Sequence, residues 1–195
     1  MESQQTQPLT SAPPDRKQQR LTYVLAALVA AAVVVLLIVW LATRGGSSNA
    51  ARLPAVGTPA AVSEAQLREL AKQTNHPVYW AGAKKGAYEL TRLADGRVYV
   101  RYLPSRDAVG ARAPKYLTVG TYPTRHAFRA IRRAAGRPGA VSLKIDHNGL
   151  LVFNQATPKS VYFGYPAATY QVEVYDPSPQ AARTLVLSGR ITPID

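Results

Sequence analysis

The chain has 195 residues, with 24 lysine and arginine side chains against 11 aspartate and glutamate side chains and a formal net charge of +13. It contains no cysteine, which excludes disulfide bonds, thiolate zinc sites and cysteine nucleophiles. The excess of positive charge favours anionic partners, which outside a cell are lipid headgroups and acidic wall polymers and inside it are nucleic acids.

The first predicted element is a transmembrane helix over residues 21–43, because the sequence from Leu21 to Ala42 carries no charge. At about 1.5 Å per residue this run gives roughly 33 Å of helix, just over the ~30 Å hydrocarbon core of a bilayer. This apolar run is longer than the apolar segment of an ordinary signal peptide, although cleavage after Ala51 remains an alternative. Aromatic rings near both ends and arginines beyond them are typical of the membrane interface, namely Tyr23, Trp40, Arg20 and Arg44.

Basic residues close to this helix predict its orientation. Arg16, Lys17 and Arg20 precede the helix, whereas Arg44 and Arg52 follow it. Since positive residues favour the cytoplasmic side, we expect the N-terminus inside and the C-terminal part outside. The lipid bilayer is therefore the first predicted partner.

Composition divides the chain into four parts. Residues 1–20 are polar and contain three prolines, which is typical of a disordered tail, here a cytoplasmic one. Residues 21–43 are the membrane span, and residues 44–62 have the Gly, Ser, Ala and Pro content of a flexible linker. Residues 63–195 are predicted to form one extracytoplasmic domain with its own core.

The domain is predicted to open with a helix, because Ser63 and Gln66 have the spacing of a capping box. A last helix is predicted after Ser178, which would cap it, with Pro179 at its first position.

A β-hairpin is predicted between these helices, at residues 87–103. Its signal is Asp95-Gly96, the typical sequence of a two-residue type I′ turn. With these two residues as the turn, Glu89 would lie opposite Tyr102. Further strands are expected at residues 116–122, 160–165 and 170–175, with a second hairpin turning at residues 146–149.

A middle helix is predicted from about Arg125 to Ala135, with Thr124 as its cap. At 100° per residue, Phe128, Ile131 and several alanines fall on one side and four arginines on the other. Guanidinium groups bind phosphate or carboxylate in bidentate geometry, so the arginine side is the candidate anion-binding site, and a merely solvated face is the alternative. The four residues are Arg125, Arg129, Arg132 and Arg133.

This order of helices and strands predicts an α+β fold: one N-terminal transmembrane helix, then a small domain with an antiparallel or mixed sheet and about three helices.

The sequence predicts no catalytic residue, cofactor or metal site. His76, His126 and His147 lie on separate elements and lack the spacing of metal ligands. Glu89 and Glu173, both on predicted strands, are the one pair of carboxylates to test for a hydrolase. Tyrosines along the strands suit stacking on a glycan, but core and edge packing explains most of them.

Four segments resemble those of uncharacterised single-pass membrane proteins of actinobacteria. The resemblance covers most of the domain and implies this layout and host, with no known activity. The segments are HPVYWAG (His76–Gly82), YELTRLADGRVYVRYLP (Tyr88–Pro104), YLTVGTYP (Tyr116–Pro123) and YQVEVYDPSP (Tyr170–Pro179).

We therefore expect a cell-membrane protein with a single span, whose extracytoplasmic domain is a binding or structural module of the cell envelope. Its expected partners are an envelope protein or an anionic wall or lipid component, and nucleic acid is not expected. The alternatives are an envelope hydrolase or transferase with an unrecognised active site, and a cytoplasmic-facing domain that contacts nucleic acid or acidic lipid.

Overall fold

The computed structural model of the chain describes residues 53–195. The predicted tail, the membrane span, its interface residues Tyr23, Trp40, Arg20 and Arg44, and the first part of the linker lie outside the described residues. Within residues 53–195, no helix is both long enough and apolar enough to cross a membrane.

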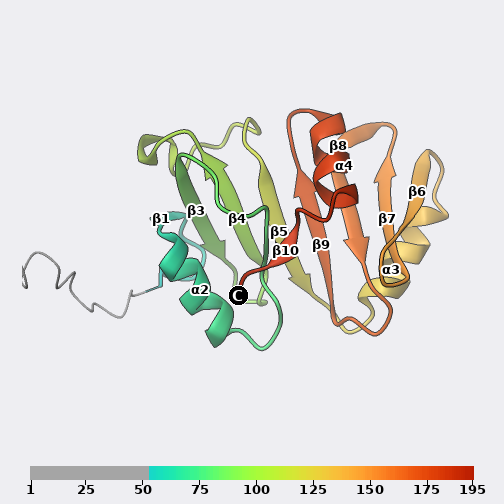
Figure 1. The fold of residues 1–195 in the computed structure, drawn as a ribbon, viewed down its shortest axis with the longest axis horizontal. Coiled ribbons are helices and arrows are strands. Elements are labelled where there is room, and N and C mark those ends of the chain that lie inside the picture. The colour runs from blue at the N-terminus through green and yellow to red at the C-terminus, as the bar shows by residue number, and fades with distance from the viewer. Residues whose placement is uncertain (1–52) are drawn as a thin grey trace, which may run out of the picture. The chain divides into compact units, whose positions relative to one another are not determined.

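One large antiparallel sheet dominates the described part of the chain (Figure 1). Its eight strands are arranged in the order β1-β3-β4-β5-β9-β8-β7-β6, and β2 and β10 form a separate two-stranded sheet. The strands of the large sheet are β1 (Ala60–Val62), β3 (Ala87–Arg92), β4 (Val98–Leu103), β5 (Thr118–Pro123), β6 (Ala140–Ile145), β7 (Gly149–Asn154), β8 (Thr157–Gly164) and β9 (Tyr170–Tyr175). The small sheet consists of β2 (Tyr79–Trp80) and β10 (Thr192–Pro193).

The predicted α+β fold class is therefore wrong. Each neighbouring pair in the large sheet is antiparallel, so the sheet is not mixed, and it forms most of the described structure. The three helices have only 9 or 10 residues and lie against the sheet. Helix signals are strong in this sequence because capping residues are local, whereas sheet size depends on pairing between distant segments such as β5 and β9.

The end of the predicted linker belongs to the sheet. Ala60–Val62 forms the edge strand β1 and pairs with Leu90, Glu89 and Tyr88 of β3. Just before it, the Gly57 amide donates a hydrogen bond to the Arg92 carbonyl. The Gly, Ala and Pro content of this segment indicated flexibility, but pairing with β3 satisfies its backbone groups and orders it.

Two helices cover one face of the sheet, α2 (Glu64–Gln73) and α4 (Pro179–Leu187) (Figure 1). The capping box of α2 is confirmed, since the Ser63 hydroxyl accepts from the Gln66 amide at 3.2 Å and the Ser63 amide donates to the Gln66 side chain at 2.9 Å. Ser178 caps α4 by accepting from the Ala181 amide, as predicted. The core lies beneath these helices in two clusters, around Leu67 and Leu90 and around Ala182 and Phe163.

The third helix, α3 (Ala127–Ala135), packs on the opposite face at the end formed by β6 to β9. A methyl group added at Gly164 of β8 would lie 3.4 Å from the Ile131 side chain, so this glycine lets the helix approach the strand. Phe163 packs in the same core cluster as Ala182 of α4. Gly164 is the next residue of the strand, and neighbouring strand residues point to opposite faces, so α3 and α4 lie on different sides of the sheet. No described α-helix packs on the part of this opposite face that β3, β4 and β5 form.

The hairpin of β3 and β4 has a different register from the predicted one. Glu89 lies opposite Arg101, and not opposite Tyr102. The turn contains three residues between Leu93 and Arg97, with Gly96 at φ 84°, which is the geometry of a type I turn followed by a bulge. This shift by one residue brings a carboxylate and a guanidinium together on the face opposite α2 and α4, away from the end that α3 covers.

Candidate functional site

The arginine side of α3 is exposed, as the amphipathic pattern predicts. Ala127 and Ile131 are buried against the sheet, and Arg129, Arg132 and Arg133 are exposed. Arg132 and Arg133 follow Arg129 by three and four residues, which are the spacings at which side chains lie on the same side of a helix. None of them forms an ion pair within the described residues.

The start of α3 differs from the prediction. The helix begins at Ala127 with His126 as its N-cap residue, and no side chain caps it, so the predicted Thr124 cap is wrong. The Thr124 carbonyl, and not its hydroxyl, accepts the Ala127 amide. Arg125 is exposed but precedes the helix, so helical spacing does not place it beside the other three arginines.

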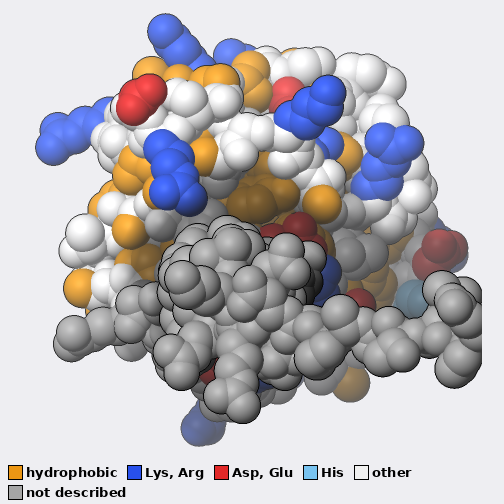
Figure 2. Space-filling view, turned by 60° about the vertical axis from the view of Figure 1, so that its left-hand side comes forward, with side chains coloured by type: hydrophobic (Ala, Val, Ile, Leu, Met, Phe, Trp, Pro, Cys, Tyr) orange, Lys and Arg blue, Asp and Glu red, His pale blue; other side chains and the backbone are white. Residues whose placement is uncertain are grey.

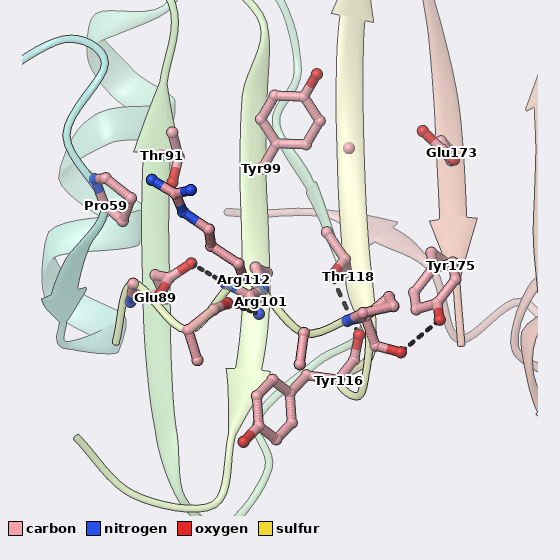
Figure 3. Close-up of a pocket in the computed structure, with 15 residues that line it drawn as sticks. Pro59, Glu89, Thr91, Tyr99, Arg101, Arg112, Tyr116, Thr118, Glu173 and Tyr175 are labelled. Carbon is pink, nitrogen blue, oxygen red and sulfur yellow. Dashed lines mark hydrogen bonds and ion pairs between the residues drawn. The ribbon is translucent and has the colours of Figure 1, made fainter. Parts of the chain in front are cut away.

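A cavity of about 400 Å³ lies on the part of the opposite face that α3 does not cover (Figure 3). Its floor consists of residues from β3, β4, β5 and β9, and its wall is the loop between β4 and β5, which includes the short 3-10 helix η1 (Arg106–Ala108). The side chains that carry its chemistry are Glu89, Thr91, Tyr99, Arg101, Arg112, Tyr116, Thr118, Glu173 and Tyr175.

A buried ion pair holds the loop against this floor. The Glu89 side chain is 1% exposed and accepts from Arg101 at 2.7 Å. Its second oxygen accepts from the Gly110 amide at 2.6 Å, and Arg101 also donates to the Ala111 carbonyl at 2.9 Å. The Arg101 guanidinium lies 5.5 Å from the centre of the Tyr116 ring. Each charge of the pair is thus matched, as burial demands.

Glu173 stands at the other end of the cavity and is held by hydroxyl groups. Tyr122 donates to one carboxylate oxygen, while Ser160 at 2.7 Å and Tyr162 at 2.9 Å donate to the other. Burial, followed by the hydrogen bond to Glu173, raises the pKa of Tyr122. Burial and then the charge of Glu173 raise the pKa of Tyr162 to about 12. Both phenols therefore remain protonated donors at neutral pH.

Gly120 makes this arrangement possible. A methyl group at this position would lie 2.9 Å from the Tyr122 ring, so the ring occupies the space above the glycine. Tyr122 folds back along its own strand and reaches Glu173 on β9.

Glu89 and Glu173 line one cavity but do not form a pair of acid and base. The strand register places them three strands and two residues apart, which is about 16 Å between Cα atoms at ordinary sheet spacing. Glu173 also points toward Ser160 and Tyr162 on β8, away from β3. Paired carboxylates that hydrolyse glycosidic bonds are separated by about 5–9.5 Å.

The three histidines lie apart in the fold. The His76 ring donates a hydrogen bond from Nδ1 to the Pro77 carbonyl, His126 is the N-cap residue of α3 without a side-chain cap, and His147 lies in the turn before β7 at φ 55°. Within residues 53–195, no group of three histidine or carboxylate side chains is placed to hold a metal ion.

Positive charge is spread over the surface. Figure 2 shows one face of the molecule, on which the lysine and arginine side chains stand apart from one another. The described residues form three ion pairs, Glu64 with Arg68, Asp95 with Arg97 and Glu89 with Arg101. Most basic side chains of the described domain therefore have no acidic partner. Three of them lie together on one side of α3.

Sequence reasoning missed the cavity, because its wall is a loop without a recognisable motif. The segment from Pro104 to Lys115 has no periodicity, and only the structure shows that Gly110 and Ala111 bind the Glu89–Arg101 pair. The sequence did single out Glu89, Glu173 and the strand tyrosines. The structure separates these tyrosines into residues packed against the core, such as Tyr102, and cavity residues, such as Tyr99.

Comparisons with protein-family models, with curated proteins and with solved structures gave no match to this chain.

Proposed function

We propose that this protein is a membrane-anchored binding module of the bacterial cell envelope, whose extracytoplasmic domain contacts an anionic wall or lipid component through the arginine side of α3. The anchor is the predicted helix at residues 21–43, and the orientation follows from the basic residues before it. In this proposal the protein belongs to the cell membrane and crosses it once, with its N-terminus in the cytoplasm.

The observation that carries this proposal is the exposed, uncompensated charge of Arg129, Arg132 and Arg133 on a helix fixed by Ile131 and Gly164. The helix fixes the backbone positions of the three arginines on one side, so their guanidinium groups reach the same surface. Each cation close to an anionic surface contributes about 1 kcal/mol to binding. Arg125, which is exposed just before the start of α3, adds a fourth positive charge near the N-terminus of the helix.

An enzymatic function with Glu89 and Glu173 as paired acid and base has less support. The Cα atoms of the two residues are about 16 Å apart by register, and each carboxylate is engaged by structural partners.

The test compares two quadruple variants of the full chain in phosphatidylcholine nanodiscs. One carries Arg125→Gln, Arg129→Gln, Arg132→Gln and Arg133→Gln. The matched control removes the same charge from exposed residues elsewhere, by Lys72→Gln, Arg106→Gln, Lys115→Gln and Lys159→Gln. Binding is measured to phosphatidylglycerol vesicles by flotation and to soluble poly(glycerol phosphate) by titration.

The proposal expects the α3 variant to lose at least about tenfold more affinity than the control for one of the two probes. The probe that is affected identifies the lipid or the wall polymer as the source of the anionic group. Equal losses in the two variants, or no binding of either probe by the unaltered chain, would contradict the proposed contact.

A further inference from the structure

The cavity beside Glu89 and Glu173 has balanced charge. Arg101 and Arg112 contribute two positive charges, and the two glutamates contribute two negative charges. A strongly charged ligand would therefore meet a like charge at one end or the other. An uncharged ligand avoids the cost of desolvating an ion.

Tyrosine rings form much of the lining. Tyr99, Tyr116 and Tyr175 each lie partly exposed at the cavity, on β4, on the loop and on β9. The Tyr175 hydroxyl donates to the Pro114 carbonyl at 2.6 Å, and the Tyr116 ring packs on Arg101, so both rings are fixed before any ligand arrives. Fixed aromatic rings offer flat apolar surface at low entropic cost.

Several polar groups in the cavity are available to a ligand. The side chains of Thr91 and Arg112 have no hydrogen-bond partner within residues 53–195, in contrast to Arg101 and Glu89. Figure 3 shows Arg112 extending from the loop over β3 toward Thr91. A guanidinium offers five donors in a plane, and a threonine hydroxyl both donates and accepts.

We propose that this cavity binds a carbohydrate. Sugars are uncharged rings that present apolar C–H faces to aromatic side chains and hydroxyl groups to planar donors and to acceptors. The volume of about 400 Å³ falls within the usual range for small-molecule sites, about 300–1,000 Å³. In this site Tyr99, Tyr116 and Tyr175 carry the sugar faces, and Arg112 and Thr91 bind hydroxyl groups. This proposal rests on the proposed function in one respect only, the extracytoplasmic location in which the domain would encounter the carbohydrate.

The experiment titrates the full chain in phosphatidylcholine nanodiscs with chitotetraose and with cellotetraose, two uncharged oligosaccharides. Arg112→Gln removes the available guanidinium, and Tyr116→Ala removes one ring. Arg106→Gln is the matched control, because Arg106 is exposed on the same loop but does not line the cavity. The near-ultraviolet circular dichroism of each variant reports whether the tyrosines keep their native packing.

We expect the unaltered chain to bind at least one of the two oligosaccharides, with a loss of about tenfold or more in Arg112→Gln and no change in Arg106→Gln. The four arginine substitutions around α3 should leave this binding unchanged, so the two proposals fail separately. Absence of oligosaccharide binding, or equal affinities of Arg112→Gln and Arg106→Gln, would overturn the carbohydrate site. So would binding of poly(glycerol phosphate) that depends on Arg112, because the cavity would then be an anion site.

Discussion

Removal of the Glu89 carboxylate tests whether the ion pair with Arg101 organises the face that holds the cavity. Glu89 is 1% exposed and Arg101 is 18% exposed, so a variant Glu89→Leu leaves a mostly buried guanidinium without its counter-charge. Loss of one partner of a buried pair costs about 3–5 kcal/mol, and the partial exposure of Arg101 places the expected loss near the lower end, at about 3 kcal/mol. The Gly110 amide also loses its acceptor.

The assay is urea unfolding of the full chain in detergent micelles, followed by circular dichroism. The double variant Glu89→Leu with Arg101→Met removes both charges, and we expect it to recover at least half of the lost free energy. Glu64→Gln is the control, because the exposed pair of Glu64 with Arg68 contributes only about 0.3–0.5 kcal/mol. A loss below about 1 kcal/mol in Glu89→Leu, or additive losses in the double variant, would refute the reasoning.

Two further predictions concern pH and packing. Burial raises the pKa of Tyr79, Tyr102 and Tyr122, and raises that of Tyr162 to about 12. Since the folded state then holds these protons more tightly than the unfolded state, the contribution of these tyrosines to the free energy of unfolding should be fully present below about pH 10 and fall as the pH rises toward 12; tyrosine absorbance at 295 nm should change together with unfolding, and separate titration of the phenols before unfolding would contradict this. A methyl group at Gly149 would lie 2.7 Å from both Ile145 and the Tyr165 ring, whereas at Gly136 the nearest atom is 3.7 Å away. Gly149→Ala should therefore lower the free energy of unfolding by about 1–3 kcal/mol and Gly136→Ala by less than about 0.5 kcal/mol, and equal effects would show that the contact at Gly149 relaxes without cost.

Local signals in the sequence were sufficient for the helix caps and for the amphipathic side of α3. Ser63 and Ser178 cap their helices through residues three positions away, and such contacts do not depend on the rest of the fold. The burial of Ile131 and the exposure of Arg129 likewise follow from a period of 3.6 residues.

Register and sheet size could not be predicted in the same way. Asp95-Gly96 occurs in two-residue turns and in three-residue turns, and the choice between them moves Glu89 from Tyr102 to Arg101. The pairing of β5 with β9, about fifty residues apart, has no local signature at all. The cavity depends on the hairpin register and on the pairing of β5 with β9. The sequence therefore singled out Glu89 and Glu173 but could not predict the cavity that they line.

The central claim, that a membrane anchor holds the described domain outside the cell, can be tested by labelling introduced cysteines. The chain has no cysteine of its own, so a membrane-impermeant maleimide reports only on an introduced one. Gln155→Cys lies at an exposed turn between β7 and β8, and Ser3→Cys lies in the predicted cytoplasmic tail. In intact cells, the account predicts labelling of Gln155→Cys at once and of Ser3→Cys only after permeabilisation. The reverse pattern would contradict it.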